Sequence, residues 1–146
     1  MKKFIYSAVI MGLVLGLSLC PLRGADTARA ELNTHISEIN RAAKSGNKMP
    51  TALHAVAIET GVPLERVEAM HKRYPDEGPA GVLMASVLAD ETKKSPEEFL
   101  NRHHSGQIWT KIVQANHVSL DKFHERLDHV DRALNSASDK PEKRKK

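Results

Sequence analysis

The stretch IETGVPLERVEAM, from Ile58 to Met70, combines a helical approach, a short polar break and an acidic start to a second helix. The same order returns in DETKKSPEEFL, residues 90–100, and in ANHVSLDKFHERL, residues 115–127. Each unit reads as a helix pair that is unable to bury its apolar face alone. Stacking of such units shares the burial, so we expect the pairs to build one core.

The three stretches align position by position. Thr60, Thr92 and Asn116 correspond, and the next residues along the chain fall in the break. The break positions are Gly61, Lys93 and His117. The capping positions are Pro63, Ser95 and Ser119, and the expected buried positions are Val67, Phe99 and Phe123. The repeat therefore predicts three similar turns, each followed by a helix with a buried residue in its first turns.

Apolar residues at helical spacing predict helices over residues 26–44, 52–60, 63–73, 82–91, 96–104, 107–115 and from 119 to about 136. The segment YPDEGPAG, residues 74–81, is expected to break the chain, and its adjacent acids Asp76 and Glu77 to be solvated. Ser95 is expected to cap the next helix, with Glu98 completing a capping box. No alternating strand pattern is present in the sequence.

The fold class predicted is all-α: a single-domain bundle of about six short helices built from repeated helix-turn-helix pairs. We divide the chain into a signal peptide at 1–24, an N-terminal helix and linker at 25–50, a helical domain at 51–136 and a disordered basic tail at 137–146. The length allows one domain, and aromatic residues make up only 4% of the chain. The core must therefore consist mainly of aliphatic side chains.

The N-terminal residues have the layout of a bacterial secretory signal. MKK precedes an uncharged apolar run from Phe4 to Cys20, and PLRGAD then restores polarity. Cleavage after Gly24, or after the better but more distant small-x-small match Ala28-Arg29-Ala30, predicts a periplasmic or secreted protein. Two alternatives stay open: retention of the run as an inner-membrane anchor, which is at the short limit for a span, and lipidation at Cys20. Cys20 is the only cysteine, so the cleaved chain has no thiol chemistry.

Most of the excess positive charge lies at the ends of the chain. The whole chain has 22 basic and 18 acidic side chains, whereas residues 25–139 hold 14 basic and 17 acidic ones. The tail KPEKRKK, from Lys140 to Lys146, is a solvated charge run that allows weak contact with anionic lipid headgroups. The acidic balance of the remainder lacks the basic face expected of a DNA-binding domain.

Two resemblances follow from these stretches. IETGVPLERVEAM looks like the alanine-x3-glycine-valine core of bacterial helix-turn-helix domains. The order TGVPLERVEAMH, GVLMASVLADETKKSPEEFL and SGQIWTKIVQANHVSL resembles a group of uncharacterised small exported bacterial proteins over residues 52–130, although Trp109 here lacks the flanking glycines usual in that group. This second resemblance implies a helical fold and supplies no activity.

Nucleic-acid reading by the repeated units is an alternative that requires the N-terminus not to be a signal. The second helices open with acids, which stabilise a helix N-terminus through its dipole but would repel phosphates. These acids are Glu65, Glu68, Glu97, Glu98, Asp121 and Glu125. We therefore expect structural helix pairing and no nucleic-acid partner.

Histidine is frequent, and its densest cluster is HERLDHVD, from His124 to Asp131. His124 with Asp128, and Glu125 with His129, are i,i+4 pairs able to offer ligands to zinc or copper, or simply to form a solvated helix face. His103 and His104 are expected to lie at a helix C-terminus, where protonated imidazole is favoured. Trp109 is either a partner-binding residue or the largest piece of the core.

No nucleophile paired with a base, glycine-rich phosphate loop or GxSxG motif is present in the sequence. We therefore expect no enzyme and no cofactor. The function predicted is an exported envelope protein that binds an unknown envelope protein through its helical surface. The first alternative is a periplasmic protein that binds zinc or copper through His124, Glu125, Asp128 and His129.

Overall fold

The computed structural model describes residues 23–138, which form a helical bundle with no strand in that range. The predicted all-α fold class is confirmed, and the described residues hold seven α-helices, one for each of the seven helical ranges expected from the sequence. They are α1 (Arg23–Lys44), α2 (Met49–Thr60), α3 (Leu64–Arg73), α4 (Gly78–Thr92), α5 (Pro96–His104), α6 (Trp109–Ala115) and α7 (Asp121–Ser138), with short 3-10 turns η1 (Ser45–Asn47) and η2 (Pro75–Glu77). Most of the predicted signal peptide and of the predicted basic tail lies outside the described residues.

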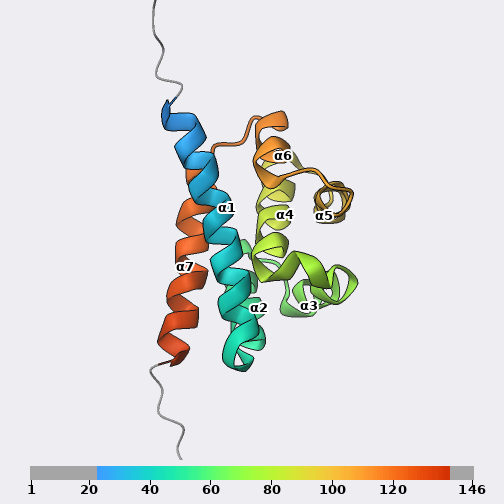
Figure 1. The fold of residues 1–146 in the computed structure, drawn as a ribbon. Coiled ribbons are helices and arrows are strands. Elements are labelled where there is room, and N and C mark those ends of the chain that lie inside the picture. Colours follow the sequence, from blue (N-terminus) through green and yellow to red (C-terminus); the bar gives the residue numbers. More distant parts are fainter. Residues whose placement is uncertain (1–22, 139–146) are drawn as a thin grey trace, which may run out of the picture.

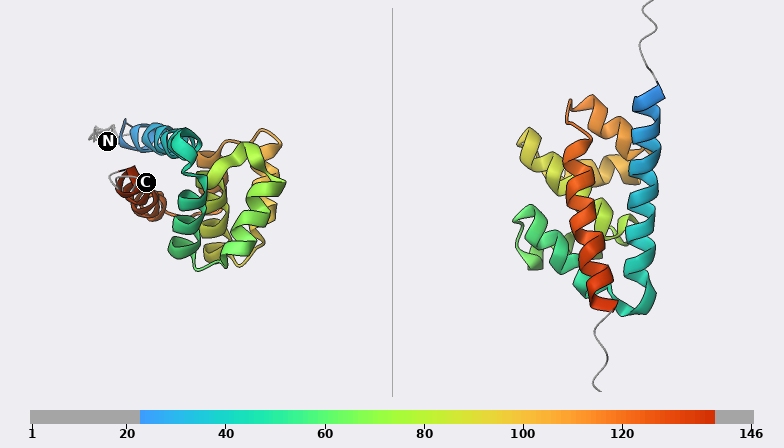
Figure 2. Two further views of the ribbon diagram at one scale, coloured as in Figure 1. Left: turned by 90° about the horizontal axis from the view of Figure 1, so that it is seen from below. Right: turned by 90° about the vertical axis from the view of Figure 1, so that its left-hand side faces the viewer.

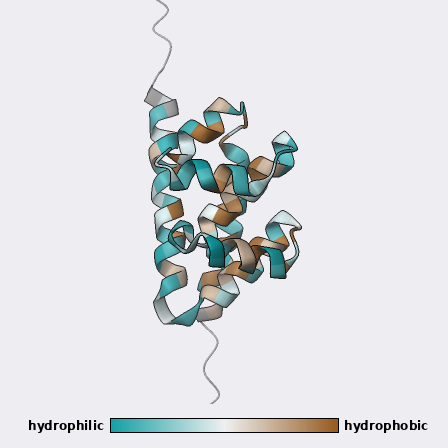
Figure 3. Cartoon of the chain, turned by 90° about the vertical axis from the view of Figure 1, so that its right-hand side faces the viewer, coloured by the Kyte–Doolittle hydropathy of each residue, from teal (hydrophilic) through white to brown (hydrophobic). Residues whose placement is uncertain are grey.

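The two longest helices, α1 and α7, run side by side in the same direction along one edge of the molecule (Figures 1 and 2). The shorter helices pack on their other side. Helix α4 contacts α1, α2, α3, α5 and α7, and all residues from Gly78 to Leu88 are buried. Its sequence is apolar almost all round, which explains its central position. The outer helices are amphipathic, with hydrophilic and hydrophobic residues interspersed along their ribbons (Figure 3).

The repeated sequence folds into a repeated turn, since α2–α3, α4–α5 and α6–α7 are each a helix pair joined by a short break. Gly61, Lys93 and His117 all take up the left-handed backbone conformation, with φ of 67°, 58° and 55°. This conformation is a common way to end a helix, usually on glycine. Lysine and histidine adopt it here against their intrinsic preference, so the turn geometry is imposed by the packing of the pairs.

The flanking positions of the repeat also match in three dimensions. The side chains of Thr60, Thr92 and Asn116 each donate a hydrogen bond of 2.7 Å to the backbone carbonyl four residues earlier. Seven residues further along, the three side chains are fully buried, namely Val67, Phe99 and Phe123. The repeat is therefore a shared structural solution and not a coincidence of composition.

One continuous core includes the N-terminal helix. Leu32, Ile39 and Ala43 of α1 are fully buried beside Leu127 and Leu134 of α7 in the same cluster. The N-terminal helix of the segment expected at 25–50 therefore packs into the same core as the helical domain expected at 51–136. The linker expected at residues 45–50 is short: η1 turns the chain at Gly46, where φ is 65°, and α2 begins at Met49.

The start of α4 was predicted wrongly, because the glycines and proline of residues 78–81 are helical. The Asn40 side chain on α1 caps this helix from across the fold: its Nδ2 donates to the carbonyl of Glu77 at 2.9 Å, and its Oδ1 accepts the amide of Ala80 at 3.0 Å. A Cβ at Gly78 would lie 2.3 Å from Asn40 Oδ1, and φ there is 65°. Only glycine fits both the space and the backbone.

The cap of α5 is partly as predicted. Ser95 is the N-cap residue, and its hydroxyl accepts the amide of Glu97 at 3.3 Å. The expected reciprocal contact from Glu98 is absent from the hydrogen bonds of the described residues, because Glu98 instead faces Lys94 at 3.5 Å. The Ser95 hydroxyl also donates to the Glu97 carboxylate, and this bond, with weaker help from Arg66, lowers the pKa of Glu97.

Candidate binding site at the α5–α6 corner

A buried carboxylate lies where η2, α5 and α6 meet. Glu77 is 5% exposed, which overturns the expectation of a solvated loop acid. Its Oε2 lies against Nδ1 of His103, and neither atom has another hydrogen-bonding partner in the described structure. A buried charge needs a partner, so His103 is held in place by Glu77 and does not simply extend into solvent from the end of α5.

Trp109 completes this corner. Its ring stacks on His103, with ring centroids 4.5 Å apart and an angle of 13° between the planes. It is 3% exposed, so the prediction of a partner-facing tryptophan is corrected in favour of the core. Gly81 makes the room: a Cβ there would lie 2.9 Å from Glu77 Cβ and 3.6 Å from Trp109 Cζ2. The α4, α5 and α6 helices are locked together at this point.

On the outer side of this corner the surface is hollowed between α5 and α6. We call this the α5–α6 hollow. It has a volume of about 420 Å³ and is lined by Arg102, Gly106, Gln107, Ile108, Lys111 and Ala115. Ile108 is 48% exposed, one of two large hydrophobic residues that are exposed in the described part of the chain. The hollow therefore combines an aliphatic side chain with two cations and no acid.

The predicted metal ligands separate across α7 instead of converging. His129 Nδ1 lies 2.8 Å from Glu59 Oε2 on α2, whereas Asp128 Oδ1 lies 3.6 Å from His35 Nε2 on α1. Glu125 is exposed. The i,i+4 spacing is real, but the packing of α7 between α1 and α2 points the side chains to different neighbours.

His124 lines a second hollow, of about 410 Å³, with residues of α1 that include Glu31, His35 and Glu38. Across residues 23–138, no group of three or more histidine, cysteine, aspartate or glutamate side chains is arranged to hold a metal ion. The metal hypothesis remains a prediction, without a ligand set in this region to support it.

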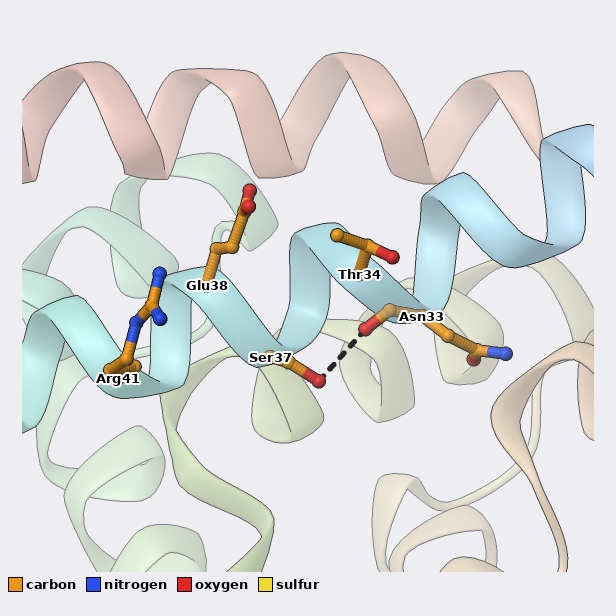
Figure 4. Close-up of a pocket in the computed structure, with 5 residues that line it drawn as sticks. All are labelled: Asn33, Thr34, Ser37, Glu38 and Arg41. Atoms are coloured by element: carbon orange, nitrogen blue, oxygen red, sulfur yellow. Dashed lines mark hydrogen bonds between the residues drawn. The ribbon is translucent and has the colours of Figure 1, made fainter.

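A third hollow runs along α1 and is lined by Asn33, Thr34, Ser37, Glu38 and Arg41 (Figure 4). All five residues belong to a single helix and are exposed. Ser37 donates to the carbonyl of Asn33 at 3.0 Å, which is an internal helix contact. A hollow walled by one helix offers no convergent polar groups, so it does not qualify as a site.

His71 on α3 is a partly buried histidine with a lowered pKa. Burial, and secondly the positive charge of Lys44, lower the pKa of His71. Its Nδ1 is buried without a hydrogen-bonding partner in the described structure. His71 therefore favours the neutral form in the folded state, and it lies outside the α5–α6 hollow.

Sequence reasoning missed Glu77, Asn40 and the hollow itself. For Glu77, the nearby Gly78 and Gly81 were a signal of close approach, but they were interpreted as a chain break. Asn40 carried no signal, because its partners lie 37 and 40 residues away. Ile108 and Trp109 are adjacent in an apolar stretch, and only the folded backbone shows that Trp109 is buried while Ile108 is half-exposed.

Comparison with family models, curated proteins and solved structures found no match for this chain. Within residues 23–138, none of the helices has the length and apolar character needed to cross a membrane.

Proposed function

We propose that this chain is an exported, non-enzymatic envelope protein that binds another protein through its helical surface. The observation that carries the binding proposal is the α5–α6 hollow, where Ile108 is half-exposed beside Arg102 and Lys111. A hollow that gathers an exposed aliphatic side chain and two cations offers a partner both apolar and electrostatic contacts. Export rests on the signal-like pattern of residues 1–24 in the sequence alone.

Nucleic-acid binding is less well supported by the geometry of the repeat. The second helices of the three units expose Glu65 and Glu68, Glu98, and Asp121 and Glu125. These are the positions from which a recognition helix would meet phosphates or base edges. Acids there repel the nucleic-acid backbone, so we favour helix pairing as the role of the repeat.

Two measurements test this function. Intact mass of the protein from separated cytoplasm, periplasm and membranes is expected to show a periplasmic species that begins near Ala25. A full-length cytoplasmic mass would overturn the export proposal. An anchored chain would retain the apolar run and fractionate with the membrane.

Site-specific crosslinking in the envelope tests the surface. A photo-reactive benzophenone amino acid is placed at Ile108, and a matched one at Ser37 in the single-helix hollow on α1. We expect a discrete crosslinked protein from position 108 that is absent from position 37. Identical patterns from both positions, or none beyond those of an unrelated exported protein, would contradict binding through this corner.

A further inference from the structure

The α5–α6 hollow has an uncompensated positive charge. Arg102 and Lys111 belong to no ion pair among the described residues, and the other lining residues are neutral. By contrast, two cations that lie between helices have an acidic partner: Lys122 meets Glu91 at 2.7 Å, and Arg66 meets Glu97 at 3.6 Å. The hollow is therefore complementary to a ligand with negative charge.

The charge surrounds an aliphatic patch. Lys111 lies three residues after Ile108 and four residues before Ala115. These three side chains therefore share one face of α6 and its cap. Arg102 comes from α5 on the other side of the loop. A ligand that carries only phosphate or carboxylate would leave Ile108 in water. A ligand that has an aliphatic group between two carboxylates would cover Ile108 with the aliphatic group and pair its carboxylates with Arg102 and Lys111.

The walls of the hollow are held before any ligand arrives. Gly106 N donates to the carbonyl of His103 at 2.8 Å, and Gln107 N donates to the carbonyl of Arg102 at 3.1 Å, which closes the end of α5. Beneath them, Trp109 and His103 are stacked, and Glu77 contacts His103. A surface that is already ordered loses little conformational entropy on binding. The volume of about 420 Å³ suits a few side chains rather than a whole helix.

We propose that the α5–α6 hollow binds a short acidic segment of a partner protein, in which a leucine- or isoleucine-type side chain lies between two carboxylates. The aliphatic side chain covers Ile108 and Ala115, and the carboxylates meet Arg102 and Lys111. This inference rests on the proposed function and specifies the chemistry of the partner.

The test uses fluorescence anisotropy with the protein isolated from cells and a labelled hexapeptide of alternating glutamate and leucine. Two matched peptides replace either glutamate by glutamine or leucine by alanine. We expect binding of the first peptide that weakens as salt rises, because exposed charges are screened. Each matched peptide should bind about tenfold more weakly, equivalent to about 1.4 kcal/mol.

Protein variants locate the binding. Ile108→Ser and the double variant Arg102→Glu with Lys111→Glu are each expected to reduce affinity by about tenfold or more. Ile58→Ser, at the other exposed isoleucine, and Lys72→Glu, at an exposed lysine of α3, are the controls and should leave affinity within about twofold. Circular dichroism checks that each variant keeps its helical content.

Several results would overturn the inference. Equal loss in the control variants would mean non-specific attraction, and equal binding of the glutamine peptide would remove the role of the cations. If duplex DNA displaces the peptide, and the same variants weaken DNA binding, the hollow recognises phosphate. If the protein sediments as a dimer and Ile108→Ser abolishes the dimer, the occupant is a second copy of this chain. If position 108 crosslinks to an envelope protein while the acidic peptide fails to bind, the proposed function stands and this partner chemistry falls.

Discussion

The left-handed residue in each repeated turn gives a prediction whose sign differs between the copies. At Gly61, φ is 67° and a Cβ would meet nothing within 4 Å, so Gly61→Ala adds backbone strain without a steric clash. The left-handed conformation costs an L-residue about 1–2 kcal/mol, and alanine recovers about 0.4–1 kcal/mol by restricting the unfolded chain. We expect a net loss of about 1 kcal/mol of folding stability.

Lys93→Gly should have the opposite effect, because φ at Lys93 is 58° and glycine relieves the strain. Relief of about 1–2 kcal/mol, less the entropic cost of glycine of about 0.5–1 kcal/mol, leaves a gain of about 0.5–1 kcal/mol. The contact of Lys93 with Asp90 at 3.2 Å is highly exposed and contributes little. His117→Gly should behave in the same way, since its φ is 55°.

Urea unfolding followed by circular dichroism measures these differences, and thermal unfolding should shift by about 4 °C per kcal/mol for a domain of this size. The pair of signs is the test: alanine at 61 must destabilise while glycine at 93 stabilises. A neutral Gly61→Ala, or a destabilising Lys93→Gly, would refute the argument that left-handed strain at a shared turn controls the stability of the repeat.

Three further outcomes are expected. Asn40→Ala removes both hydrogen bonds to the start of α4 and leaves the Ala80 amide without its partner, so urea unfolding should show a loss of about 2–3 kcal/mol, whereas Asn33→Ala on the exposed face should be nearly neutral. The lowered pKa of His71 means that below about pH 6.5 the unfolded chain takes up a proton that the folded chain resists. Stability should therefore fall between pH 7.5 and 5.5 by less in His71→Gln than in the natural chain, and an identical fall would contradict this assignment. Zinc titration by calorimetry should be unchanged by alanine at His124 and His129, because they face different neighbours; weaker zinc binding in that variant would restore the metal hypothesis.

Local signals predicted the helices well where they acted over a few residues. Gly61 ends α2, Ser95 caps α5, and Phe123 of α7 is buried, as the sequence indicated. These features depend on backbone conformation, on side chains near helix ends and on the helical period. These local features, and the threefold repeat of the turn, could therefore be predicted from the sequence.

The candidate site was not available in the same way. Glu77 is buried because His103, 26 residues later, and the space left by Gly81 receive it; taken alone it is an acid in a proline-glycine loop. The helical start at Gly78 depends on Asn40, whose side chain reaches it only when α1 packs beside α4. Such contacts leave no local sequence pattern, because the two partners are far apart in the chain and neither one alone indicates that the other will lie beside it.

What the sequence by itself determined was the all-α class, the helix pairs and most of the core, because hydrophobic periodicity and capping are encoded within each helix. What only the tertiary structure decided was which polar groups meet. The packing of α7 divided the four predicted metal ligands, and the turn between α5 and α6 placed Trp109 inside and Ile108 outside. Two adjacent residues can differ in burial because burial depends on which other helices pack against each side chain.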